Sequence, residues 1–129
     1  MTEKNEHFGY EIIRDHVLSD ILGKNETEIL YWAGKSLARK FPLYTLDEAP
    51  DFFFEANFGE LTLEKSGKDE TVYLLKPVKT ENRCFKLEAG FLAQQKQKLG
   101  GYLTEAYDEL IPKKKLVRII LKTDLREKV

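Results

Sequence analysis

Cysteine and histidine are scarce in this sequence. Its 129 residues include one cysteine, Cys84, and two histidines, His7 and His16. A single cysteine excludes an internal disulfide framework and the common multi-cysteine zinc sites. The two histidines do not stand at ligand spacing, so we expect neither a metal nor a cofactor. His16 alone, on a predicted helix, is a weak signal for a haem ligand.

Signals for secretion, membrane insertion, nucleic-acid binding and catalysis are also missing. The chain starts with polar residues and contains no long apolar run, so we expect a cytoplasmic protein without a membrane span. A net charge of −1 gives no general attraction for nucleic acid, and the lysines of residues 112–115 are interpreted as a solvated turn. There is no Gly-rich phosphate loop and no Gly-x-Ser-x-Gly turn, so we assign no catalytic residues and predict that the protein is not an enzyme.

The composition is that of a folded globular protein. Hydrophobic residues make up 42% of the chain and charged residues 33%, and this length predicts one domain over residues 1–129. Charge is distributed unevenly, with six basic and twelve acidic side chains in residues 1–60 and fifteen basic and ten acidic in residues 61–129. Such a split can favour self-association, but it is more often only a solvated surface.

Residues 8–22 have the pattern of an amphipathic helix. Apolar side chains recur at steps of three and four residues: Ile12, Ile13, Val17, Ile21 and Leu22. Charged side chains lie on the other side: Glu11, Arg14, Asp15 and Asp20.

Two further helices are expected before the first strand. Asn25 and Glu28 form a capping-box pattern that starts the second helix, and Pro42 ends it at Phe41. The three phenylalanines at 52–54 fit either a strand or a short third helix. We favour the helix, with Pro50 at its first position.

Two β-hairpins are predicted in the second half of the chain. Residues 59–65 and 71–75 form the first, with period-two alternation in the earlier strand. Residues 102–110 and 116–122 are interpreted as the second, although 102–110 could also be helical by propensity.

A fourth helix is expected between the hairpins, from about Cys84 to Leu99, because Gly100 and Gly101 follow as a stop signal. The order of elements is therefore ααα-ββ-α-ββ. This order predicts an α+β fold in which a helical layer packs on a four-stranded antiparallel sheet.

Two of the predicted helices carry small residues in their interiors. Gly34 stands near Ala33 and Ala38, and Gly90 stands between Ala89 and Ala93. A glycine within a helix costs about 1 kcal/mol relative to alanine, so a compensating interaction is expected. We favour close helix–helix approach, within the monomer or across a dimer, over a ligand lying against the backbone.

Cys84 and Glu88 are the two side chains of the fourth helix that are candidates for a functional role. Cys84 is interpreted as a small buried hydrophobe, or alternatively as a thiol whose pKa the helix N-terminus lowers. Glu88 lies in an apolar window and is expected to be paired or to contact a ligand, because an unpaired buried carboxylate is costly. Its predicted partners are three cations of the second helix: Lys35, Arg39 and Lys40.

Three strings carry a family resemblance: Tyr31–Leu43, Phe54–Thr62 and Cys84–Gln95. In this order they resemble the YslB-like family of uncharacterised bacterial proteins, over about residues 10–124. That family more distantly resembles ligand-binding domains of vinyl-4-reductases, haem nitric-oxide sensors and the trafficking-particle (TRAPP) subunits of Golgi transport. The resemblance implies a helical layer on an antiparallel sheet, often dimeric, with an apolar cavity in some relatives.

The sequence departs from each of these distant groups. No histidine matches the proximal haem ligand, and residues 101–129 lack the cysteines that vinyl-4-reductase domains often carry near their last hairpin. Cys84 does not align with the cysteine that is acylated in trafficking subunits. Kinship at the level of the fold therefore transfers no activity.

Two functions are predicted from these observations. The first is a non-enzymatic cytosolic module that binds a small apolar ligand or acyl chain in an internal cavity. Its ligand-binding residues would be Trp32, Lys35, Arg39, Cys84, Glu88 and Phe91. The alternative is a protein–protein interaction module that acts as a homodimer through its helical face.

Overall fold

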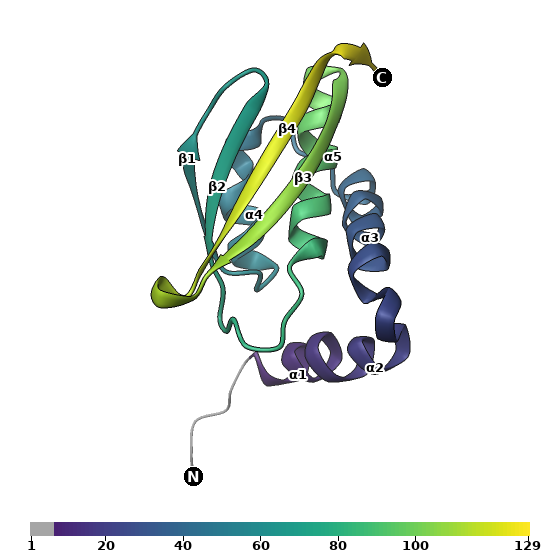
Figure 1. The fold of residues 1–129 in the computed structure, drawn as a ribbon, viewed down its shortest axis with the longest axis vertical. Helices are drawn as coiled ribbons and strands as arrows, with labels where there is room; N and C mark the ends of the chain where they lie inside the picture. Colours follow the sequence, from purple (N-terminus) through teal and green to yellow (C-terminus); the bar gives the residue numbers. More distant parts are fainter. Residues whose placement is uncertain (1–6) are drawn as a thin grey trace.

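The computed structural model describes residues 7–129 and has an α+β architecture (Figure 1). The helical elements, in chain order, are α1 (Phe8–Glu11), the π-helical η1 (Ile12–Val17), α2 (Leu18–Leu22), the 3₁₀ turn η2 (Gly23–Asn25), α3 (Glu26–Lys40), η3 (Leu46–Glu48), α4 (Ala49–Glu55), α5 (Lys86–Gly100) and η4 (Pro112–Lys114). The strands are β1 (Glu60–Lys65), β2 (Glu70–Lys76), β3 (Tyr102–Ile111) and β4 (Leu116–Lys128). The predicted order and fold class are confirmed.

The four strands form one antiparallel sheet in the order β1-β2-β4-β3. Both predicted hairpins are present, and β2 joins β4 in the middle of the sheet, where Tyr73 pairs with Ile119. The helical alternative for residues 102–110 is wrong. β4 also continues beyond the predicted end at 122, as far as Lys128.

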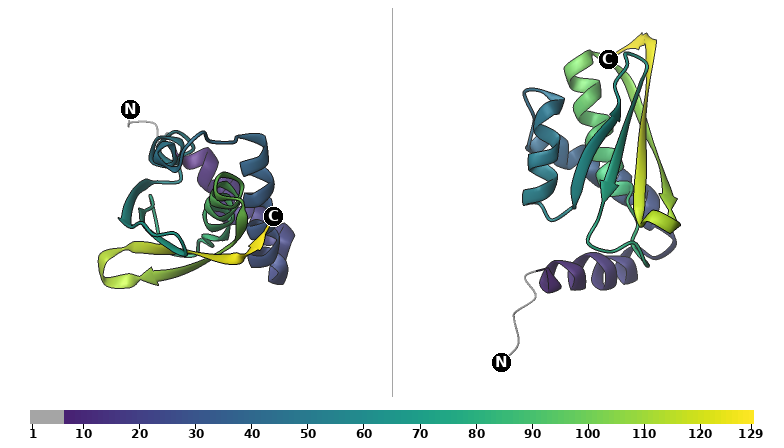
Figure 2. Two further views of the ribbon diagram at one scale, coloured as in Figure 1. Left: turned by 90° about the horizontal axis from the view of Figure 1, so that it is seen from above. Right: turned by 90° about the vertical axis from the view of Figure 1, so that its left-hand side faces the viewer.

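The helices cover one face of this sheet, and α5 lies between the sheet and α3 (Figure 2). Phe91 of α5 is at the centre of the core, where its ring stacks on Phe52 at 4.5 Å and meets Phe53 edge-on at 6.0 Å. The phenylalanine triplet thus belongs to helix α4, with Pro50 in its first turn, as predicted.

The predicted start of α3 is confirmed, but its predicted capping box is wrong. The Asn25 side chain makes no capping hydrogen bond, although α3 does begin directly after it. The capping box lies instead at Thr45 and Glu48, at the start of η3. There the Glu48 carboxylate accepts hydrogen bonds from the backbone N–H groups of Thr45 and Tyr44 at 3.0 and 3.2 Å.

The two interior glycines face each other across the α3–α5 contact. A Cβ atom on Gly34 would stand 2.8 Å from the backbone nitrogen of Phe91 and against the carbonyl oxygen of Leu87. A Cβ atom on Gly90 would collide with the carbonyl oxygen of Tyr31 in the same way. The expected close approach of two helices is confirmed, and it occurs within the monomer.

Gly90→Ala tests this contact. Backbone atoms cannot move aside as a flexible side chain would, so we expect the variant to lose about 1–3 kcal/mol of unfolding free energy despite the better helix propensity of alanine. Urea unfolding followed by circular dichroism measures the change. Gly100→Ala is the matched control, because nothing lies near its Cβ position in the same helix. A Gly90→Ala variant as stable as the wild type would contradict the close contact.

Candidate functional site

The six residues expected to bind a ligand do not converge on one space. The Trp32 side chain on α3 is 64% exposed, whereas Phe91 is fully buried against Phe52. Lys35 Nζ bonds to Glu105 of β3 at 3.0 Å. Arg39 reaches Gln94 of α5 only at 3.5 Å on the surface. The remaining two, Cys84 and Glu88, both accept hydrogen bonds from Arg14.

Glu88 is fully buried and pairs with Arg14, whose Nη2 lies 2.7 Å from Oε1 of the carboxylate. The expectation of a paired carboxylate is confirmed, but the predicted partners Lys35, Arg39 and Lys40 are wrong. Gly34 lies at the α3–α5 contact, and the basic side chains beside it bond elsewhere, Lys35 to Glu105 and Arg39 to Gln94. Arg14 arrives instead from the N-terminal helical segment, 74 residues earlier in the chain.

Arg14 and its neighbour Asp15 form the centre of a buried charge network. Arg14 also donates to the Tyr10 hydroxyl at 2.6 Å and to the carbonyl oxygen of Cys84 at 2.7 Å. Asp15 accepts two hydrogen bonds of 2.8 Å from Arg83. Arg14, Asp15, Arg83 and Glu88 are called the buried charge network below. It connects the N-terminal segment to the start of α5 and to the loop that precedes it.

The network sets the charge states of its members. Burial raises the pKa of Asp15, but the hydrogen bonds and the charge of Arg83 outweigh it, so the pKa of this carboxyl is below its usual value. Burial likewise opposes the charged form of Arg14, and Glu88 more than compensates by raising the Arg14 pKa. Both pKa shifts favour the charged forms of Asp15 and Arg14.

Cys84 takes part through its backbone and not through its thiol. Burial raises the pKa of the thiol above its usual value, so the predicted lowering by the helix N-terminus is wrong. The thiol is half-buried and not disulfide-bonded, and it borders a hollow of about 210 Å³ whose walls include Phe85 and Val117. The raised pKa disfavours the thiolate, which is the form that acts as a nucleophile.

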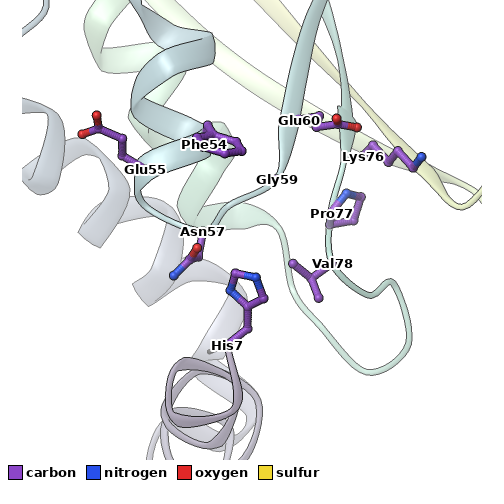
Figure 3. A pocket seen from close by; sticks show the side chains of 9 residues that line it. All are labelled: His7, Phe54, Glu55, Asn57, Gly59, Glu60, Lys76, Pro77 and Val78. Carbon is purple, nitrogen blue, oxygen red and sulfur yellow. The ribbon is translucent and has the colours of Figure 1, made fainter. Parts of the chain in front are cut away.

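A larger hollow, of about 510 Å³, lies where the start of α1 meets the α4–β1 turn and the end of β2 (Figure 3). Its lining residues are His7, Phe54, Glu55, Asn57, Gly59, Glu60, Lys76, Pro77 and Val78. The Phe54 ring and the Pro77 and Val78 side chains form its apolar wall, and the Lys76 ammonium group points away from it (Figure 3). None of the six expected ligand residues lines it. Sequence reasoning missed this hollow because its residues come from three separate segments without a shared motif.

The N-terminal helical segment α1–η1–α2 buries its charged side and exposes its apolar side, which is the inverse of the usual amphipathic helix. Arg14 and Asp15, on its charged side, are buried at 2% and 8% exposure. An apolar stripe normally faces the core, but here it faces solvent. The exposed members are Ile12, Ile13, Val17 and Ile21, which we call the exposed apolar face.

This inversion has a physical cause in the buried charge network. Charged groups are buried when they are paired and hydrogen-bonded, and the network supplies these partners on one side of the segment. The segment lies crosswise at the end of the helical layer (Figures 1 and 2), and the apolar side chains on its opposite side are exposed. The sequence revealed the stripe, but the direction in which it faces depends on Arg83 and Glu88, far along the chain.

Metal-binding clusters and membrane-spanning helices are both missing from residues 7–129. Among residues 7–129, no three histidine, cysteine or carboxylate side chains are grouped so that they could hold a metal ion. Within the same residues, no helix combines the length and the apolar character needed to cross a bilayer.

A double-mutant cycle tests the Arg14–Glu88 pair. Glu88→Leu leaves the Arg14 charge buried without its partner, so we expect a loss of about 3–5 kcal/mol in unfolding free energy. Combining it with Arg14→Met removes both charges, and the double variant should be more stable than Glu88→Leu alone. Urea unfolding measures all three variants. Lys65→Met, at the exposed pair with Glu70, is the control and should change stability little. Equal losses for the single and double variants would argue against coupling.

Comparison with known proteins agrees with the resemblance seen in the sequence. The fold is similar to that of a vinyl-4-reductase family protein from Methanocaldococcus jannaschii, with a TM-score of 0.58 and 20% identity over 95% of this chain and 84% of that one. An H-NOX protein from K. algicida is less similar, with a TM-score of 0.41 and 12% identity over 86% of this chain and 59% of that one. The chain is 40% identical to the uncharacterized protein YslB of Bacillus subtilis (strain 168), over 95% of its own length and 87% of the relative. Residues 7–122 match the family described as "Protein of unknown function (DUF2507)", and the chain belongs to this family.

Proposed function

We propose that the chain is a non-enzymatic protein-interaction module that acts as a homodimer through the exposed apolar face of its N-terminal segment. The observation that carries this proposal is the inversion of that segment. Ile13 is 52% exposed and Ile21 72% exposed, while Arg14 and Asp15 between them are buried. Full burial of a side chain of this size contributes about 1.5–3 kcal/mol, so a surface that covers the face gains substantial free energy.

The neighbouring helix also exposes apolar side chains. α3 follows the segment directly after the short turn η2, and it exposes Ile29 and Trp32 at 40% and 64%. Aromatic side chains such as tryptophan are enriched at protein–protein interfaces. In this proposal Trp32 serves protein contact, in place of the ligand contact first expected for it.

The uneven charge of the two halves of the chain does not support this dimer. A two-fold interface joins the same face of both copies, so the acidic N-terminal half would meet itself. The proposal therefore depends on apolar burial. The exposed apolar face is suited to such an interface because its outermost members are aliphatic.

Val17→Asp tests the homodimer. A carboxylate in the centre of an apolar interface is costly to bury, so we expect at least about a tenfold weaker dimer, equivalent to 1.4 kcal/mol. Light scattering after size exclusion, over a range of protein concentrations, gives the mass. Leu125→Asp, at an exposed position near the end of β4, is the matched control and should remain dimeric. A wild-type protein that stays monomeric at the highest concentration would refute the proposal.

The hollow of Figure 3 favours a second candidate function, binding of a small apolar ligand. Its volume of about 510 Å³ is within the usual range of ligand pockets, and Phe54, Pro77 and Val78 supply apolar contact. This location differs from the one expected around Trp32 and Phe91.

Native mass spectrometry of freshly purified protein tests the ligand. We expect a bound small molecule or lipid that Phe54→Asp removes and Trp32→Ala does not, because only Phe54 lines the hollow. Loss of the molecule in Trp32→Ala alone would place the ligand near α3. A wild-type protein without any bound molecule would count against this candidate function.

A further inference from the structure

The apolar residues of the N-terminal segment are arranged symmetrically about Val17. Ile13 and Ile21 each lie four residues from it, and Ile12 and Leu22 each lie five residues from it. Three of these positions, Ile13, Val17 and Ile21, are spaced by four residues and share one solvent-facing side. An apolar pattern that is symmetric about one residue is suited to contact with an antiparallel copy of itself.

We propose that the partner is a second copy whose N-terminal segment runs antiparallel to the first, with a two-fold axis beside Val17. This inference rests on the proposed homodimer and specifies how its two copies meet. In an isologous interface, residue i contacts residue j and j contacts i. Val17 therefore meets Val17 of the partner subunit, and Ile13 meets Ile21 of the partner subunit in two equivalent contacts.

The helix dipoles favour the antiparallel arrangement over a parallel one. A parallel pair would align the two dipoles side by side, which is unfavourable, whereas the antiparallel pair opposes them. His16 and Asp20 are exposed beside the stripe, so polar side chains border the apolar contact.

The buried charge network prepares the face for this contact. Arg14 and Asp15 are held from behind by Glu88 and Arg83 through bonds of 2.7 and 2.8 Å. Docking on the opposite side breaks none of these bonds. A face that is already held in its binding conformation loses less conformational entropy on association.

Disulfide cross-linking between single cysteines tests the arrangement. The background is Cys84→Ser, which removes the only thiol and keeps the backbone carbonyl that Arg14 contacts. Val17→Cys in this background should form a disulfide-linked dimer by itself under mild oxidation, because a disulfide needs Cβ atoms about 3.5–4.5 Å apart. We expect cross-linking about tenfold or more faster than for Leu125→Cys, which sets the rate of random collision.

The paired positions discriminate the register and direction. Ile13 and Ile21 are about 12 Å apart along a helix, so Ile13→Cys alone and Ile21→Cys alone should cross-link slowly. A one-to-one mixture of the two, with one protein ¹⁵N-labelled, should instead give a mixed disulfide dimer. Non-reducing gels give the rates, and mass spectrometry identifies the mixed species.

The outcomes separate this inference from the proposed function. Rapid self-cross-linking of Ile13→Cys, with no gain in the mixture, would indicate parallel segments and overturn the inference, while the homodimer would stand. A dimer that Val17→Asp dissociates but in which no cysteine pair exceeds the collision rate would also overturn only the arrangement. If the background protein is monomeric and Val17→Cys cross-links no faster than Leu125→Cys, both the antiparallel arrangement and the homodimer are overturned.

Discussion

The buried pair of Arg14 and Glu88 is the interaction on which the arrangement of this protein depends. It joins the N-terminal segment to α5, the central helix, and both charges are removed from water. Two further acceptors, the Tyr10 hydroxyl and the Cys84 carbonyl, bond to the Arg14 guanidinium, whereas Arg14 Nε and Glu88 Oε2 are buried without a hydrogen-bond partner among the described residues. Breaking such a buried pair is costly, because it leaves an uncompensated charge. With Asp15 and Arg83 beside it, the pair determines which side of the segment is inside. The apolar side is left outside as a consequence.

A second constraint holds the helical layer together. Gly34 and Gly90 let the backbones of α3 and α5 touch, and Phe91, next to Gly90, is thereby directed between the sheet and α4. The rings of Phe52 and Phe53 occupy the space around it. The residues first expected to surround a ligand serve other ends: Phe91 fills the core, Glu88 anchors the N-terminal segment, and Lys35 connects α3 to β3. The candidate sites of the molecule lie elsewhere, at the exposed apolar face and at the hollow beside Phe54.

Family membership and fold similarity are different kinds of evidence about this chain. Membership of the family rests on sequence over nearly the whole chain, and its described function is unknown. The similarity to the vinyl-4-reductase family protein shows a shared fold at 20% identity, and a fold hosts many functions. The proposals for this chain therefore depend on its own residues: on the direction of the apolar stripe, on its symmetry about Val17 and on the lining of the hollow.

Local patterns were sufficient to predict most of the elements. The strand β1, the glycine stop after α5 and the proline in the first turn of α4 follow from patterns of a few residues, and the predicted elements are present. The alternation does not appear in the burial of β1, where Leu61 alone is buried. The small residues at 34 and 90 predicted a close helix contact for the same reason, since the cost of an interior glycine is local. The partner of Glu88 was beyond this kind of reasoning, because Arg14 competes with Lys35, Arg39 and Lys40 only once the chain has folded. The stripe of the N-terminal segment was evident from the sequence. Only the tertiary structure decided that it faces outward, because burial of a helix face depends on which distant groups can pair with it.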